Sequence, residues 1–418
     1  MIGGFKMEVS KQYVHRMGSK SIRLIGEDGQ PLSNQRVNIS QTNHRFLFGC
    51  GAFDSVPLVN GELVGDEENA IKERFEKWFA LFNAGTLPFY WGGFEPQPGQ
   101  PKTDAIMKAA RWLKERKVNV KGHPLCWHTA CAPWLLSMNN DEILKTQIDR
   151  IHRDVTQFKG VIDMWDVINE VVIMPIFDKY DNGITRICKD KGRIGLIREV
   201  FAAAREANPQ SVLLLNDFNT SISYEILIDG CLEAGIPIDV IGIQSHQHQG
   251  YWGLEKLNEV LERYSHFGLP IHFTENTLIS GDLMPPEIVD LNDFKADEWP
   301  STPKGEERQA KEIKELYSTL FAHPLVEAVT TWSVVDGKWL KAPAGLLRSD
   351  NSSKPSYETL LQLIKKDWWT KEALITDDSG IVKITGFKGD YEITLDQQFK
   401  GQFVIDDQDE MEILQVKK

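Results

Sequence analysis

The chain has 418 residues, 41% of them hydrophobic and 26% charged, which suits a globular protein built on one large α/β barrel with an appendage. No window approaches the roughly 18 uncharged apolar residues of a membrane helix, so we expect no membrane-spanning segment. The formal net charge of -13 argues against nucleic acids and anionic membranes as partners, because both bind clustered Lys and Arg side chains, and it favours a neutral or cationic ligand.

Residues 1–44 are predicted to form an N-terminal β-segment. The start of the chain, Met1 to Glu8, has no apolar signal core, so the sequence as written predicts a cytoplasmic protein, or a secreted one if a signal peptide has been removed. Two strands are expected between residues 21 and 42, because the stretch from Glu27 to Pro31 contains the Asp-Gly and Pro residues of a tight turn.

Residues 45–366 alternate β-like segments with amphipathic ones. The first strand is predicted at residues 46–53, and apolar residues at helical spacing predict a helix over residues 67–82. Further helices are expected at 104–116, 194–207 and 306–321, and further strands are expected to end near Tyr90, His128, Glu170, Phe218, His246, Glu275 and Asp336. This alternation predicts a closed (β/α)8 TIM barrel, with functional residues at the C-terminal ends of its strands. An open doubly wound sheet is disfavoured because no GxGxxG turn follows the first strand.

Residues 367–418 are predicted to form a small β-module. Short segments at 373–376, 381–385, 391–395 and 402–405 are separated by turn residues and lack helical periodicity. Because isolated short hairpins are barely stable, we expect these strands to pair with the N-terminal ones, in a module that braces the barrel rather than binds carbohydrate. The connections at 176–193 and 278–303 are long enough to act as lids.

Two glutamates, Glu170 and Glu275, each stand where an apolar strand-like segment ends. Either one alone would be interpreted as a solvated surface charge. On one barrel rim, however, two rigidly held carboxylates can divide the acid and nucleophile roles at an acetal carbon. The acid then needs a pKa raised from roughly 4.3 toward 6–7 by burial and a neighbouring negative charge, whereas the nucleophile must stay ionised.

Seven segments of the barrel region form a pattern shared with one enzyme family. They are Lys121-Gly122-His123-Pro124-Leu125-Cys126-Trp127-His128, Trp165-Asp166-Val167-Ile168-Asn169-Glu170, Asn216-Asp217-Phe218-Asn219, Gly242-Ile243-Gln244-Ser245-His246, Phe273-Thr274-Glu275, Thr331-Trp332-Ser333-Val334-Val335-Asp336 and Gly345-Leu346-Leu347-Arg348-Ser349-Asp350. Through their joint order and spacing the chain resembles glycoside hydrolase family 10, the retaining β-1,4-xylanases, from about residue 46 to residue 364.

The resemblance implies a retaining glycoside hydrolase that cleaves β-1,4-xylosidic bonds in xylan or xylo-oligosaccharides by double displacement, without a cofactor or metal. Glu170 would be the general acid/base and Glu275 the nucleophile. Substrate-binding roles are implied for His123, Trp127, Asn169, His246, Trp332 and Trp339.

The chain departs from the family pattern at the loop after the second strand. Typical members carry Glu-Asn-x-x-Lys there, whereas this chain has residues 86–94 with Phe89, Tyr90 and Trp91. We expect Phe89, Tyr90 and Trp91 to substitute by stacking on the substrate, in a remodelled non-reducing-side subsite for a short, decorated or aryl-linked glycoside. Thr277 replaces an Asp that supports the family's nucleophile-contacting histidine.

Two smaller departures follow. After Trp127-His128 this chain has Thr129-Ala130-Cys131, where the family has a Gln. After Trp339 it has Leu340, where an Arg is common.

Three alternative functions stay open. One is a β-glycosidase for such short, decorated or aryl-linked glycosides. A metal-dependent barrel hydrolase is another, because His246-Gln247-His248 with His123, His128 and Asp336 offers metal-ligand types. A barrel that binds glycans without cleaving them is the third. The five cysteines are scattered, odd in number and without a CxxC pair, which indicates buried thiols rather than disulfides or a zinc knuckle.

Overall fold

The computed structural model describes residues 12–408 and 410–416, and the chain divides into two compact units. One unit comprises residues 48–317 and 325–357. The other combines residues 12–47 with residues 318–324 and the described residues from 358 to 416. In the described part of the chain, no helix is both long and apolar enough to cross a membrane.

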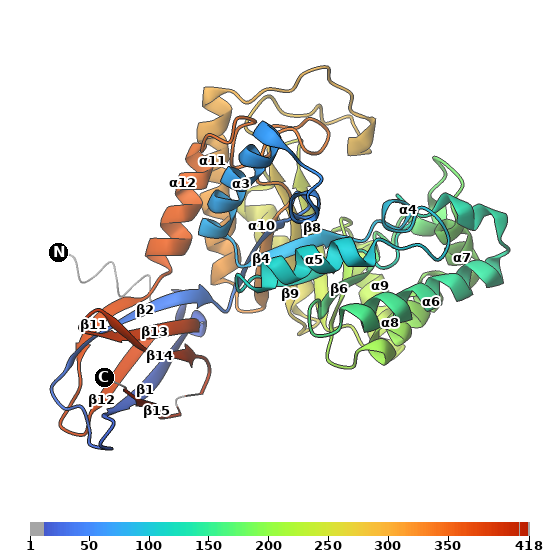
Figure 1. The fold of residues 1–418 in the computed structure, drawn as a ribbon. Coiled ribbons are helices and arrows are strands. Elements are labelled where there is room, and N and C mark those ends of the chain that lie inside the picture. The colour runs from blue at the N-terminus through green and yellow to red at the C-terminus, as the bar shows by residue number, and fades with distance from the viewer. Residues whose placement is uncertain (1–11, 409, 417–418) are drawn as a thin grey trace. The chain divides into compact units, whose positions relative to one another are not determined.

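The first unit is a closed barrel of parallel strands in the order β10-β3-β4-β5-β6-β7-β8-β9, with helices between successive strands (Figure 1). The predicted TIM barrel is therefore confirmed. Most residues of its strands are buried, as expected for a parallel sheet covered by helices. The strands are β3 (Leu47–Gly51), β4 (Ala84–Pro88), β5 (Asn119–His123), β6 (Met164–Asn169), β7 (Val212–Asp217), β8 (Val240–Gln247), β9 (Ile271–Leu278) and β10 (Val326–Thr331).

The helices follow the expected amphipathic pattern. In the helix from residue 65 to residue 81, Ile71, Phe75, Trp78 and Leu81 recur every three or four residues and are buried. The α-helices are α2 (Ser55–Asn60), α3 (Gly65–Leu81), α4 (Trp91–Phe94), α5 (Thr103–Lys114), α6 (Asn140–Phe158), α7 (Gly183–Lys191), α8 (Arg193–Ala207), α9 (Ile222–Glu233), α10 (Gly253–Ser265), α11 (Pro303–Ala322) and α12 (Pro355–Gln362). Short helical turns are η1 (Val14–Arg16), η2 (Pro133–Ser137), η3 (Met174–Ile176), η4 (Leu291–Asp293) and the π-helical η5 (Leu363–Asp367).

The second unit contains two small sheets. Their orders are β12-β1-β15 and β11-β2-β13-β14, so the pairing of N-terminal with C-terminal strands is confirmed. Ile22, Val37, Ile39, Tyr391 and Ile393 belong to a core of buried side chains. The strands are β1 (Met17–Ile25), β2 (Arg36–His44), β11 (Lys371–Ile375), β12 (Ile381–Phe387), β13 (Gly389–Leu395), β14 (Gln398–Ile405) and β15 (Glu412–Gln415).

Some predicted boundaries were wrong. The segment 176–193, expected to be a loop, contains α7, whose first turn is capped when the Asn182 side chain accepts a hydrogen bond from the Thr185 N–H. β5 ends at His123, so His128 lies beyond the strand. β9 continues past Glu275 to Leu278, because the polar residues that follow still pair with β8.

Candidate active site

Glu170 is the first residue after β6. Its backbone has a φ of 57°, the left-handed region that side chains other than glycine seldom occupy, and its N–H donates to the Asn216 carbonyl at 2.9 Å. The carboxylate accepts hydrogen bonds from Trp127 Nε1 at 2.9 Å, Gln244 Nε2 at 3.1 Å and Asn169 Nδ2 at 3.3 Å. The irregular turn is therefore fixed from several sides, as is common where a backbone conformation serves a function.

Burial, and next the negative charge of Glu275, raise the pKa of Glu170 to about 8. The hydrogen bonds from Trp127 and Gln244 lower this pKa but do not outweigh the two effects that raise it. Glu170 is therefore a protonated carboxylic acid at neutral pH. A carboxyl group in this state can give a proton to a leaving oxygen.

Glu275 lies within β9 and is 4% exposed. The register against β8 changes just before it, from Ile243 paired with Phe273 to Gln244 paired with Glu275. Its Oε1 accepts from Asn216 Nδ2 at 3.1 Å, and its Oε2 lies 3.1 Å from His246 Nε2. Side-chain nitrogens thus contact both oxygens of the carboxyl group.

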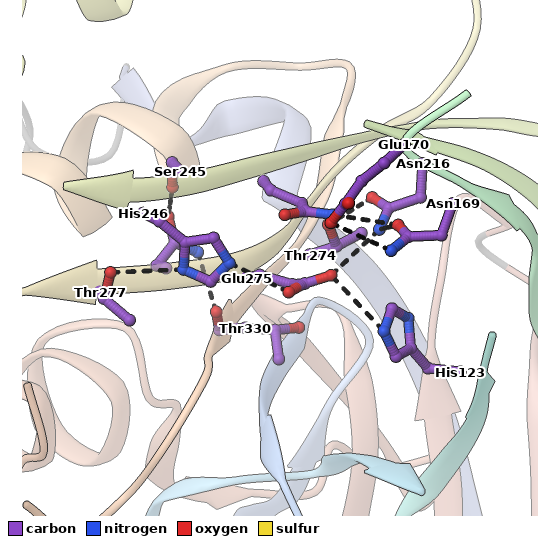
Figure 2. A network of polar contacts seen from close by, with 12 residues as sticks. His123, Asn169, Glu170, Asn216, Ser245, His246, Thr274, Glu275, Thr277 and Thr330 are labelled. Carbon is purple, nitrogen blue, oxygen red and sulfur yellow. Dashed lines mark hydrogen bonds and ion pairs between the residues drawn. The ribbon is translucent and has the colours of Figure 1, made fainter. Parts of the chain in front are cut away.

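A chain of side-chain amides connects the two carboxylates (Figure 2). Asn216 Nδ2 donates to Asn169 Oδ1 at 2.8 Å, and Gln244 Nε2 donates to the same oxygen at 3.0 Å. Because that oxygen accepts twice, the Asn169 amide is fixed with its Nδ2 toward Glu170. Asn216 and Gln244 were not among the predicted site residues, although both stand near the C-terminal ends of strands, where a polar residue in an apolar run is a recognisable signal.

His123 is oriented by a buried charge pair. Its Nδ1 lies 2.6 Å from Asp166, which also binds Lys121 Nζ at 2.7 Å, and its Nε2 lies 3.9 Å from Glu275. Burial alone would raise the pKa of Asp166, but Lys121 and His123 outweigh it and hold that pKa below its usual value. The ionised Asp166 directs the second ring nitrogen of His123 toward the site.

Aromatic rings surround the carboxylates. The Tyr90 ring lies 5.7 Å from those of both His123 and Trp127. The Trp332 ring lies 5.4 Å from His123, and Trp339 lies 4.5 Å from the His246 ring. The structure therefore brings most of the predicted substrate-binding side chains together around the two glutamates.

Trp91 lies elsewhere. It is 3% exposed, donates from its indole nitrogen to Glu95 at 3.0 Å and packs beneath the Arg150 guanidinium at 4.7 Å. Phe89 is fully buried against Trp165. Of the three consecutive aromatic residues only Tyr90 reaches the site, because Trp91 begins α4 and turns into the core.

A pocket of about 280 Å³ lies beside Tyr90, Trp332 and Trp339. Its polar lining is an ion cluster in which the Asp54 carboxylate binds the Arg74 guanidinium and, at 2.9 Å, Lys338 Nζ. These charged side chains come from three separate parts of the chain. The pocket therefore combines aromatic faces with both hydrogen-bond donors and acceptors.

The histidines considered as metal ligands are used differently. His246 contacts Glu275, while His248 contacts Thr277 Oγ1 at 3.2 Å, and His128 packs against the Phe177 ring. Within residues 12–408 and 410–416, no group of three or more His, Cys, Asp and Glu side chains is arranged to hold a metal ion.

Known proteins resemble this chain in sequence. The profile of Glycosyl hydrolase family 10 matches residues 71–363. An endo-1,4-beta-xylanase of Geobacillus stearothermophilus is 28% identical over 263 residues, covering 59% of this chain and 75% of that protein. The endo-1,4-beta-xylanase/feruloyl esterase of Xylanibacter ruminicola is 28% identical over 49% of this chain, and anti-sigma-I factor RsgI6 of Acetivibrio thermocellus is 23% identical over 93% of it. The matches span only 32% and 46% of those two longer proteins.

The barrel fold recurs in solved structures. Xylanase 10B from Thermotoga petrophila, determined in complex with xylobiose, superposes with a TM-score of 0.62 at 22% identity, covering 77% of this chain and 95% of that one. The family 10 structure from Paenibacillus barcinonensis gives the same score, identity and coverage. At this identity the likeness concerns the fold.

Proposed function

The chain belongs to Glycosyl hydrolase family 10, and from this premise we propose that it cleaves β-1,4-xylosidic bonds in xylan or xylo-oligosaccharides with retention of configuration. The observation that carries the proposal is the contrast between its two strand-end carboxyl groups. Glu170 keeps its proton at neutral pH, whereas Glu275 accepts a hydrogen bond from Asn216 Nδ2 on one oxygen and lies 3.1 Å from His246 Nε2 on the other. The xylanase names of several relatives support the choice of sugar.

In the first step, a Glu275 oxygen attacks the anomeric carbon while the bond to the leaving oxygen breaks. Glu170 gives its proton to that oxygen, so the products are a glycosyl ester of Glu275 and a free sugar hydroxyl. Esterification removes the charge of Glu275, which is one cause of the raised pKa of Glu170. The pKa of Glu170 then falls, and its carboxylate can act as a base.

In the second step, Glu170 takes a proton from water as the water oxygen attacks the anomeric carbon. The ester bond breaks, and Glu275 leaves as a carboxylate. Asn169 Nδ2 and His123 Nε2 face this centre and are the groups we assign to sugar hydroxyls. Trp332 and Trp339 offer aromatic faces to the sugar ring.

We assign the pocket containing Asp54, Arg74 and Lys338 to the neighbouring sugar unit. A sugar hydroxyl both donates and accepts hydrogen bonds, so it suits a cluster of one carboxylate and two cations. An anionic ligand group suits the cluster less well, because it would be repelled by the Asp54 carboxylate. These side chains would replace polar groups that the loop of residues 86–94 lacks. Lys338→Gln should raise KM for xylotriose more than for an aryl xyloside, whereas Lys341→Gln, an exposed neighbour, should change neither.

The deciding experiment is a product analysis on xylan, short xylo-oligosaccharides, aryl β-xylosides and aryl β-glucosides. We expect xylosides to react, with the first product in the β configuration by NMR, and Glu275→Ala to abolish release of the aryl group. An α product would contradict retention. Reaction of aryl β-glucosides alone would favour a β-glycosidase for short or aryl-linked glycosides, and loss of activity on chelation would favour the metal-dependent alternative.

A glycan-binding barrel without turnover is the second candidate. The observation that favours it is the match to an anti-sigma factor, a regulatory protein by name, over 93% of this chain. This candidate predicts that calorimetry detects xylo-oligosaccharide binding while no product forms over long incubation. Hydrolysis that depends on both Glu170 and Glu275 would exclude it.

A further inference from the structure

The Thr277 hydroxyl lies between two histidine rings near the C-terminal ends of β8 and β9. Its Oγ1 is 3.4 Å from His246 Nδ1 and 3.2 Å from His248 Nδ1, and Figure 2 shows the first of these contacts. His246 is paired with Thr277 in the register of the two strands, and its other ring nitrogen contacts Glu275. A continuous series of polar groups thus runs from His248 to the proposed nucleophile.

We propose that Thr277 and His248 are positioning residues that hold His246 as the tautomer with its proton on Nε2, so that the ring donates to Glu275. The inference deepens the proposed function and rests on it for the role of Glu275. The tautomer itself is a property of the resting protein that can be measured without turnover.

The count of protons selects one arrangement. A hydroxyl has one hydrogen and two lone pairs, so Thr277 donates to at most one histidine and accepts from at least one. If it donated to His248, or accepted from both rings, a neutral His246 would carry its proton on Nδ1 and turn a lone pair toward the Glu275 carboxylate. If it donates to His246, the Nε2–H of that ring faces Glu275, and every contact has one donor and one acceptor.

His248 supports the second arrangement. Among the residues that the structure describes, its buried Nε2 has no hydrogen-bond partner, and a buried acceptor without a partner is less costly than a buried N–H without one. The ring therefore carries its proton on Nδ1 and donates a hydrogen bond from it to Thr277 Oγ1. Burial, and next the proximity of His246, lower the pKa of His248 to about 3, so this ring stays neutral at working pH.

Within residues 12–408 and 410–416, the carboxylate that contacts His246 is that of Glu275. Glu275 faces its Nε2 side from β9, and the neutral His248 follows β8. His123, from the end of β5, lies near Glu275. Trp332 and Trp339, from the segment after β10, place their indole rings beside the His246 ring. A hydroxyl relay thus orients His246 without an ionised partner behind it.

The test compares Thr277→Val, which removes the hydroxyl at nearly constant shape, with Thr277→Ser, which keeps it. We expect Val to lower kcat/KM for an aryl xyloside about tenfold or more and Ser to restore most of it. Thr331→Val, a buried threonine whose hydroxyl bonds Tyr317, controls for the general cost of this change in a barrel strand. Equal activity of the Val and Ser variants would overturn the relay.

Nitrogen NMR of histidine-labelled protein supplies the second readout, with the His246 signals assigned from a His246→Gln variant. We expect a protonated Nε2 and an unprotonated Nδ1 in the wild type and mixed tautomers in Thr277→Val. A protonated Nδ1 on His246 in the wild type would refute the inference even if the enzyme is active. If no glycoside reacts, the proposed function fails while this spectrum still decides the tautomer.

Discussion

Replacing Glu170 with Gln should stabilise the protein against unfolding, by an amount that grows with pH. The replacement should also abolish catalysis that needs a proton from residue 170. The folded chain keeps the Glu170 proton up to about pH 8, whereas an ordinary glutamate loses it near 4.5. Stability from this proton is therefore fully present below pH 4.5 and declines as pH rises toward 8. At about 1.36 kcal/mol per pKa unit, the free energy of unfolding is lower by on the order of 3 kcal/mol at pH 7, and by on the order of 5 kcal/mol above pH 8, than it is below pH 4.5.

Gln cannot ionise, so the variant avoids this cost. Calorimetric melting from pH 4 to pH 9 should give equal Tm values for variant and wild type near pH 4.5 and a gap that widens to a few degrees by pH 8. Glu67→Gln, an exposed site on α3, is the matched control and should show no such trend. A gap independent of pH would refute the assignment of Glu170 as a group held neutral by its surroundings.

Three further substitutions test the groups around the carboxylates. Trp127→Phe removes a donor that favours ionised Glu170, so the pKa of Glu170 should rise and the alkaline limb of kcat/KM should move up by as much as about one pH unit. Lys121→Met leaves the buried Asp166 without its cation, and urea unfolding should reveal a loss of about 3 kcal/mol that shrinks as acid protonates Asp166. Tyr90→Ala should raise KM for xylo-oligosaccharides about tenfold while changing kcat less; equal losses in kcat would contradict a binding role.

The barrel and its two carboxylates were accessible from sequence for a local reason. A strand that is buried on both faces contains a short run of apolar residues in the sequence. The residue at which such a run ends is therefore expected at the C-terminal end of a barrel strand, where functional residues lie. Glu170 follows β6 directly, so the pattern located it closely. It located the end of β9 less well, because Asn276 and Thr277 are polar yet buried and still paired with β8.

The aromatic loop after the second barrel strand shows where local pattern fails. Phe89, Tyr90 and Trp91 are equally suited to stacking on a sugar, and only the backbone path decides which one faces the site. α4 begins at Trp91, which sends that ring under Arg150 and leaves Tyr90 beside the carboxylates. The start of a helix one residue earlier or later would change which side chain points to the site, although the composition of the loop would be the same.

The sequence by itself determined the number and order of the barrel strands, the positions of the two glutamates and the family pattern around them, because hydrophobic periodicity and motif spacing are properties of neighbouring residues. Only the tertiary structure decided which distant side chains meet. The amides that connect Glu170 to Glu275, the Thr277 relay to His248, and the pocket charges come from segments far apart in the chain. Their contacts depend on barrel closure and side-chain rotamers, and no local pattern encodes either.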